Sequence, residues 1–203
     1  MTQRVTADPS GREQAARALA TGAIVSFPTD TAYALAAGPE HPAALAGIYR
    51  MKGRPAHLPL IVLAASRAEL ADWAVLSPEA ERLARAFWPG PLTLVLPAGP
   101  RARAPIATPE GTVGVRIPAH PIAAALLART GPLATTSANR SGAPSPRSAE
   151  DVERQLGTDP DLAILLDSGP TSHDADSTVL SLVGRPRILR AGALTAQQLG
   201  IIT

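Results

Sequence analysis

The sequence predicts a single α/β domain built on a mixed sheet, from three observations along its 203 residues. Short apolar segments alternate with longer segments that begin at helix-capping residues, an order typical of α/β proteins. The last two apolar segments, 177–183 and 186–189, flank a glycine-containing turn and predict an antiparallel hairpin, so the sheet is not wholly parallel. No repeat, linker or change of composition divides the chain, and we therefore expect one domain over residues 1–203.

The predicted helices begin at recognisable residues. The Ser-x-x-acid pattern of a capping box occurs at Ser10, Ser66 and Ser148, and Ser77 precedes a proline, which is favoured in the first turn of a helix. The Trp-Pro-Gly-Pro sequence at 88–91 ends the helix that begins at Ser77. The expected helices cover residues 10–22, 41–51 and 121–129, together with segments that start at 66, 77 and 148.

The predicted strands are short apolar runs bounded by glycine, proline or polar residues. They cover residues 23–27, 60–63, 92–96, 112–117, 133–136 and 162–167, followed by the closing hairpin. Residues 97–109 are rich in Pro, Ala and Arg, and we expect a mobile surface loop there.

Composition narrows the class of protein. The chain is 45% apolar, has no cysteine and carries a formal net charge of +2 with a pI near 9.6. The lack of cysteine excludes disulfides, thiolate metal sites and a cysteine nucleophile. Without a leader-like start or a run of eighteen apolar residues, we expect a soluble, cytoplasmic protein that makes no membrane contact. The charge is compatible with an anionic ligand and does not establish nucleic-acid binding.

Lys52 stands out because it is the only lysine among 19 Lys and Arg residues. Gly53 separates it from Arg54, and in an extended segment the two basic side chains would point the same way. A compact ammonium beside a planar guanidinium would form a clamp for one phosphate or carboxylate. The alternative is a solvated basic turn.

Polar side chains also end other predicted strands, where ligand groups collect in α/β sheets. Asn139, the only asparagine, follows one strand together with Ser137, and Thr31 follows another. Arg116 ends a strand whose other residues are apolar, so its charge must be paired or face a pocket. The alternatives are turn chemistry for the first three residues and a structural ion pair for Arg116.

Basic and hydroxyl side chains outnumber carboxylates at these strand ends. This balance suits a site for phosphates and a small carboxylate better than it suits acid/base hydrolysis. The chain lacks the P-loop, the dinucleotide-binding glycine pattern, G-x-S-x-G and H-E-x-x-H, and its four histidines lack metal-ligand spacing.

Seven segments, in order and over nearly the whole chain, resemble the YrdC-like (TsaC) family of threonylcarbamoyl-AMP synthases in its short form. They lie at residues 27–33, 52–60, 88–93, 115–118, 136–142, 177–179 and 188–192. The resemblance implies a twisted mixed sheet around a large basic cavity. It also implies that L-threonine, bicarbonate and ATP condense to L-threonylcarbamoyladenylate, a nucleotidyl transfer that releases pyrophosphate and feeds t6A modification of tRNA. The partners implied are these substrates and the downstream threonylcarbamoyl transferase machinery, while direct contact with tRNA stays open.

The resemblance also assigns site residues. Positions that match the family's catalytic tetrad, on the nucleotide and phosphate side, are Lys52, Arg54, Ser137 and Asn139. Positions around the threonine are Thr31, Arg116 and Ser177. Further positions on the nucleotide side are Thr112, Thr135, Ser145 and Arg190. Mg²⁺ is expected to arrive with ATP, with no metal ligand from protein side chains and no tightly bound cofactor.

The chain departs from the family pattern at positions that bear on threonine fit. Ala34 and Ala36 replace frequent glycines, and Leu63 stands where longer members often carry histidine. Two alternatives accompany the implied function. One is a YrdC-like RNA- or nucleotide-binding protein without synthase activity, against which the intact tetrad argues. The other is adenylation with a different carbamoyl donor, as in carbamoyltransferases, whose partner domains are not found in these 203 residues.

Overall fold

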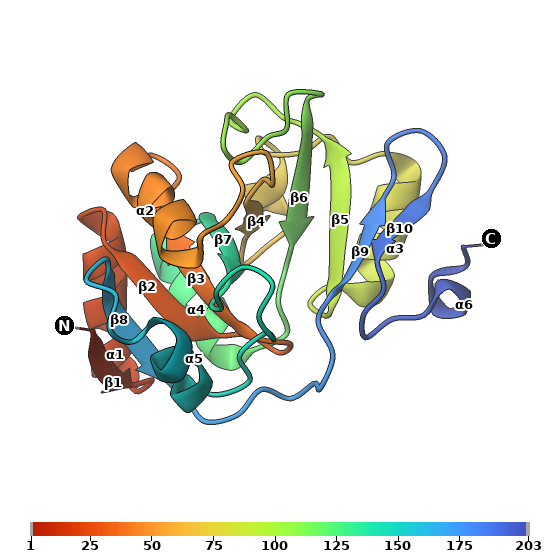
Figure 1. Ribbon diagram of the computed structural model, residues 1–203. Coiled ribbons are helices and arrows are strands. Elements are labelled where there is room, and N and C mark those ends of the chain that lie inside the picture. The colour runs from red at the N-terminus through yellow and green to blue at the C-terminus, as the bar shows by residue number, and fades with distance from the viewer. Residues whose placement is uncertain (1, 202–203) are drawn as a thin grey trace.

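The computed structural model describes residues 2–201 and contains one ten-stranded mixed sheet with helices on both faces (Figure 1). The strands are β1 (Gln3–Thr6), β2 (Ile24–Pro28), β3 (Tyr33–Ala37), β4 (Ile61–Leu63), β5 (Leu92–Pro97), β6 (Thr112–Arg116), β7 (Leu133–Ser137), β8 (Leu162–Asp167), β9 (Thr178–Ser181) and β10 (Arg187–Arg190). The helices are α1 (Pro9–Ala20), α2 (Pro42–Lys52), η1 (Ala68–Leu70), α3 (Pro78–Phe87), α4 (Pro121–Thr130), α5 (Ala149–Leu156) and α6 (Ala196–Leu199).

The strand order is β1-β8-β2-β3-β7-β4-β6-β5-β9-β10. Four neighbouring pairs are parallel (β1 with β8, β8 with β2, β4 with β6, β5 with β9), and the other pairs are antiparallel. The predicted mixed α/β sheet and its closing hairpin, β9–β10, are therefore confirmed. Since β8 and β9 occupy the second and ninth positions, residues 168–177 must cross the molecule, and this segment runs along the bottom of Figure 1.

The sheet carries one hydrophobic core on each face. One cluster packs α1 and α4 against Val25 and Phe27, and the other packs α2, α3 and α5 against the opposite face. The central strand β3 contributes to both, because Leu35 belongs to one cluster and Ala36 to the other. Burial on both faces explains the nearly continuous apolar sequences of β2 and β3.

The N-cap of the first helix lies two residues before the predicted one, Ser10. Asp8 is its N-cap, since the Asp8 side chain accepts a hydrogen bond from Gly11 N at 2.8 Å and Pro9 takes the first helical position. The prediction that Ser10 caps this helix is wrong. Proline is well suited to the first helical position because its missing N–H would have no helical partner there.

A capping test follows from this geometry. Asp8→Ala should lower the free energy of unfolding by about 1 kcal/mol, because one backbone N–H of the first turn loses its acceptor. Ser10→Ala, also at an exposed position, should change it by less than about 0.5 kcal/mol. Urea unfolding of both variants measures the difference. A larger loss from Ser10→Ala would contradict the assignment of Asp8 as the cap.

Other differences from the predicted elements are local. Strands β1 and β3 and the short helix α6 were not predicted, and the segment after Ser66 forms only the single 3₁₀ turn η1. Pro97 still belongs to β5 and Ala98 forms a β-bridge with Ala74, whereas residues 99–109 have no helix or strand. This loop does not stand free of the core. Ala102 and Ile106 are buried in the larger cluster, and Pro105 O accepts a hydrogen bond from Leu60 N at 3.1 Å.

None of the helices within residues 2–201 combines the length and the apolar composition that a membrane crossing requires.

Candidate functional site

A cavity of about 230 Å³ lies where the β2–β3 turn, the ends of the central strands and the β9–β10 hairpin come together. Its basic lining side chains are Arg54, Arg116 and Arg190. The hydroxyl side chains that line it come from Thr29, Thr31, Tyr33, Thr93, Thr135, Thr136, Ser137 and Ser177. This combination of guanidinium and hydroxyl groups matches the site for anions that the sequence predicts.

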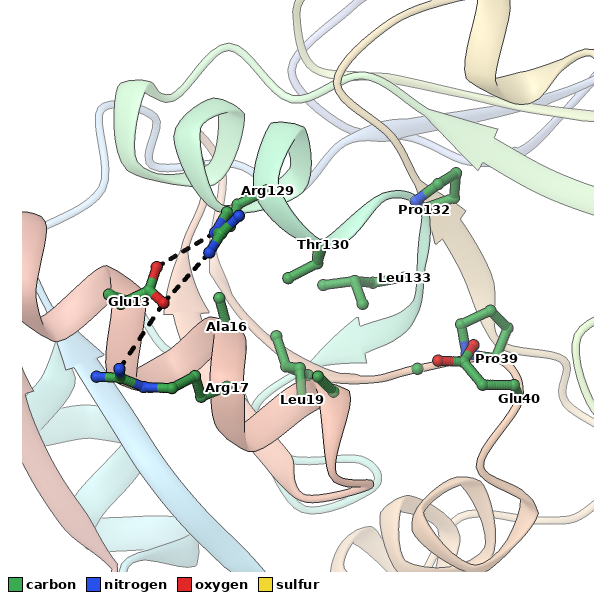
Figure 2. A pocket seen from close by; sticks show the side chains of 12 residues that line it. Glu13, Ala16, Arg17, Leu19, Pro39, Glu40, Arg129, Thr130, Pro132 and Leu133 are labelled. Carbon is green, nitrogen blue, oxygen red and sulfur yellow. Dashed lines mark hydrogen bonds and ion pairs between the residues drawn. The ribbon is translucent and has the colours of Figure 1, made fainter.

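A second cavity of about 280 Å³ lies between α1, α4 and residues 38–40 (Figure 2). Three of its four charged side chains bind one another: Figure 2 shows Glu13 between Arg17 and Arg129, and Arg129 Nε donates to Glu13 Oε2 at 3.2 Å. No predicted site residue lines it. The first cavity is therefore the candidate site.

Lys52 is the last residue of α2 and is only 3% exposed. Its Nζ donates to Ser137 O and Asn139 O, both at 2.6 Å, and to Asn139 Oδ1 at 3.3 Å. An ammonium has three N–H groups, so each of them has an oxygen partner here. Lys52 thus joins the end of α2 to the turn that follows β7, directly beneath the cavity-lining Ser137.

The segment at Lys52 is not extended, which the clamp of Lys52 and Arg54 on one anion would require. Gly53 adopts the left-handed conformation (φ 59°, ψ 37°) and ends α2, with its N–H donating to Arg50 O. Glycine adopts this conformation without the steric penalty that a Cβ would bring. The turn sends Arg54 into the cavity lining while Lys52 stays buried below it.

Burial lowers the pKa of the Lys52 ammonium from 10.5 to about 7, and the charge of Arg54 adds to the shift. Between pH 7 and 10.5 the unfolded state then binds more protons than the folded state, so the free energy of unfolding should rise with pH in this window. We expect urea unfolding between about pH 7.5 and 9 to show a slope up to about 1.4 kcal/mol per pH unit steeper for the wild type than for Lys52→Met. Equal slopes would remove Lys52 as the titrating group.

Arg54 is held by its own loop. Its Nε donates to Leu58 O at 3.2 Å and its Nη2 to Pro59 O at 2.9 Å. Burial lowers the pKa of the Arg54 guanidinium, although an arginine keeps its charge at neutral pH. The side chain therefore presents a fixed positive charge to the cavity.

Asn139 is buried, and its Nδ2 donates to Arg140 O at 2.9 Å and to Ala143 O at 2.6 Å. These bonds fix the turn whose first residue is Ser137, the last residue of β7. The four positions of the predicted tetrad are therefore brought together. Ser137 and Arg54 line the cavity, while Lys52 and Asn139 form the layer that supports it.

Arg116 ends β6, is 4% exposed and lines the cavity. It donates from Nε to Gly90 O at 2.9 Å, from Nη1 to Thr31 Oγ1 at 2.8 Å and from Nη2 to Asp30 Oδ1 at 2.6 Å. The ion pair with a nearby carboxylate, one of the two predicted alternatives, is present. Burial lowers the pKa of the Arg116 guanidinium and Asp30 opposes that shift.

Ser177 also lines the cavity and is hydrogen-bonded from two sides. Its Oγ lies 2.9 Å from Thr93 Oγ1, and it accepts a hydrogen bond from Arg190 Nη2 at 2.9 Å. Arg190 also donates to Ser177 O from Nε at 3.2 Å and from Nη2 at 2.8 Å. The hairpin β9–β10 thereby fixes one wall of the cavity.

Of the other predicted positions on the nucleotide side, some line the cavity and some do not. Thr135 lines the cavity, with its Oγ1 donating to Ile61 O at 3.3 Å. Ser145 does not line the cavity. Its hydroxyl donates to Asp176 Oδ2 at 2.9 Å, and Asp176 is a lining residue. Thr112 starts β6, at the opposite end of that strand from Arg116, and its Oγ1 lies 2.9 Å from Thr108 Oγ1 outside the cavity lining.

Sequence reasoning missed two charged residues beside the site, Asp176 and Arg147. Arg147 Nη2 donates to Asp176 Oδ1 at 2.9 Å. The position of Asp176 immediately before Ser177 was a signal for it. Arg147 had no comparable signal, because eighteen arginines give no single one prominence.

The three residues that depart from the family pattern differ in their position relative to the cavity. Ala34 and Leu63 line the cavity, whereas Ala36 is fully buried in the α1/α4 cluster and does not. Within residues 2–201, no group of three His, Cys, Asp or Glu side chains is placed to hold a metal ion.

The family model for Sua5, YciO and YrdC proteins, described as "Telomere recombination", matches residues 17–192. The chain belongs to this family. The match covers most of the chain and includes every residue of the cavity lining.

Relatives in the family agree in name. The chain is 44% identical over 190 residues to the threonylcarbamoyl-AMP synthase of Bacillus subtilis (strain 168), covering 92% of this chain and 54% of that protein. It is 38% identical over 199 residues to a putative threonylcarbamoyl-AMP synthase of Mycobacterium tuberculosis (strain ATCC 25618 / H37Rv), covering 95% of this chain and 91% of that protein. The chain thus spans about half of the longer relative and nearly all of the shorter one.

A solved structure of the family supports the fold. The crystal structure of P. abyssi Sua5 complexed with L-threonine superposes with a TM-score of 0.90 at 39% identity, covering 98% of this chain and 59% of that chain.

Proposed function

We propose that the chain is an L-threonylcarbamoyladenylate synthase, a nucleotidyltransferase that condenses L-threonine, bicarbonate and ATP and releases pyrophosphate. One observation carries the proposal. A single cavity brings together Arg54 and Ser137, which the resemblance assigns to the nucleotide side, and Arg116, Thr31 and Ser177, which it assigns to the threonine side. The names of the similar relatives support it.

Arg116 is the proposed partner of the threonine carboxylate. The guanidinium uses three of its five N–H groups on Gly90, Thr31 and Asp30, which leaves one N–H on each terminal nitrogen. Those two groups can bind a carboxylate bidentately without breaking the ion pair. Asp30 and Thr31 would then hold the guanidinium in place, and the structural ion pair and the substrate contact become compatible.

In the proposed reaction the threonine amine takes up the carbon of bicarbonate and forms a carbamate, with loss of water. A carbamate oxygen then attacks the α-phosphorus of ATP, and the bond to the leaving pyrophosphate breaks. The threonine carboxylate, the carbamate and the triphosphate are anions that must be held close together. Fixed positive charge and preorganised donors therefore supply most of the catalysis. Arg54 and Arg190 provide that charge at the cavity wall.

Lys52 would act from below the cavity. Its hydrogen bonds hold the turn that presents Ser137, and its charge lies behind that turn. Direct contact with the triphosphate would require the longest of these bonds, 3.3 Å to Asn139 Oδ1, to open. We place Ser137 and Arg54 in contact with phosphate and Asn139 in the support of the turn.

Mg²⁺ is proposed to arrive with ATP, where it would neutralise part of the triphosphate charge. The guanidinium and hydroxyl lining fits a metal–phosphate complex better than a free cation. The product would pass to the transferase machinery that modifies tRNA, and both steps would take place in the cytoplasm.

The test is a pyrophosphate-release assay in which L-threonine and bicarbonate are omitted in turn. The proposal requires release with all three substrates and a loss of signal when either is left out. Pyrophosphate release that does not depend on threonine would mean that the adenylyl group is transferred to another acceptor. Binding of ATP or RNA without any turnover would favour the alternative of a binding protein without synthase activity.

A further inference from the structure

Asp176 is the only acidic side chain that lines the cavity within residues 2–201. Its Oδ2 accepts a hydrogen bond from Ser145 Oγ at 2.9 Å, and its Oδ1 accepts one from Arg147 Nη2 at 2.9 Å. Arg190 Nη1 lies 3.8 Å from Oδ2. One hydroxyl and two guanidinium groups therefore converge on this carboxylate, and that donor set also suits phosphate.

The carboxylate sits on the segment that crosses the molecule from β8 to β9 (Figure 1). Backbone hydrogen bonds attach this segment to Arg147 and to Asp30, the partner of Arg116. Thr171 N donates to Arg147 O at 2.8 Å, and His173 N donates to Asp30 O at 3.0 Å. At its far end, Asp176 O accepts from Ala193 N at 2.9 Å. These bonds anchor the segment, and the Asp176 side chain that it carries contacts Arg147 and lies near Arg190.

Arg147 is incompletely satisfied in this arrangement. Its Nη1 is buried and has no hydrogen-bond partner within the described part of the chain. A buried donor without an acceptor is unfavourable, and a carboxylate with two oxygens already shared among three groups offers it none. A phosphate group has more acceptor oxygens and could satisfy both terminal nitrogens of Arg147.

We propose that Arg147 joins Ser145 and Arg190, both already expected on the nucleotide side, in a phosphate subsite, and that Asp176 occupies this subsite as an internal competitor until phosphates of the nucleotide replace the carboxylate. The inference rests on the proposed function, since it takes the anion to be part of ATP or pyrophosphate. Two anions cannot share these donors without strong repulsion. Nucleotide binding must therefore displace the Asp176 carboxylate, and that displacement reduces affinity.

The test is calorimetric titration of the whole chain with pyrophosphate, and separately with ATP. Asp176→Asn keeps the size and one acceptor oxygen of the side chain but removes its charge, so the Kd for pyrophosphate should fall about tenfold. Asp174→Asn makes the same change of charge at an exposed position in the same segment, and its Kd should stay within about twofold of the wild type. Arg147→Gln should raise the Kd about tenfold.

Each outcome supports or overturns the proposed phosphate subsite. Unchanged or weaker pyrophosphate binding by Asp176→Asn would overturn the role of Asp176 as a competitor. An equal fall in Kd for Asp174→Asn would show that the effect comes from the net charge of the chain, and would overturn that role as well. Unchanged binding by Arg147→Gln would remove Arg147 from the subsite. If the wild type and Asp176→Asn both failed to bind either anion, the subsite and the nucleotide site of the proposed function would fall together. Wild-type binding without the variant effect defeats only the inference.

Discussion

Lys52→Ala is expected to release pyrophosphate at least ~100-fold more slowly than the wild type, the size of effect seen when one preorganised charge-stabilising group is lost. The substitution removes all three hydrogen bonds that hold Ser137 and Asn139 to the end of α2. It also removes an ammonium group whose charged form the bound phosphates would favour. The measurement is pyrophosphate release at saturating threonine, bicarbonate and ATP.

Arg50→Ala is the matched control, because Arg50 lies on the same helix and pairs with Asp161 at the surface. Its activity should stay within about twofold of the wild type. Circular dichroism and urea unfolding establish that Lys52→Ala is folded under the assay conditions. Undiminished release by a folded Lys52→Ala protein would remove Lys52 from the catalytic set.

Arg116→Lys should raise the threonine concentration needed for half-maximal rate by about tenfold to a hundredfold, the effect of losing one charge-assisted bidentate contact. Lysine is a point charge and cannot serve Gly90, Thr31 and Asp30 while also presenting two parallel donors to a carboxylate. The requirement for ATP should change by less than about threefold.

Separate titrations of threonine and ATP measure this split. Arg187→Lys, an equivalent substitution at an exposed position of β10, serves as the control and should leave both requirements unchanged. Equal increases for threonine and ATP in Arg116→Lys would place Arg116 outside the threonine pocket and leave it as a structural ion pair.

Much of the fold could be predicted because apolar runs and capping residues are local signals. Strand β3 was missed for a physical reason. Its sequence Tyr-Ala-Leu-Ala-Ala has little intrinsic strand preference, and it is a strand because β2 and β7 pair with it on either side. Strand β1 is mostly exposed and lacks the apolar pattern altogether. In both cases pairing with distant residues decides the structure.

The site was predictable to the extent that its residues are rare or stand at strand ends. Lys52 and Asn139 are each unique in the chain, and they lie in contact. The orientation of Lys52 was not predictable, since Gly53 could end a helix as readily as it could extend a loop. The contacts of Asp176 with Ser145 and Arg147 span about thirty residues and depend on the crossing between β8 and β9, for which no local pattern exists.

The most direct test of the proposed synthase activity supplies isotope-labelled bicarbonate with ATP and L-threonine and identifies the adenylate product by mass spectrometry. The proposed function predicts one product that contains AMP, threonine and the labelled carbon, formed in equal amount to the pyrophosphate released. An adenylate without the label, or pyrophosphate release with no threonine-containing product, would contradict it.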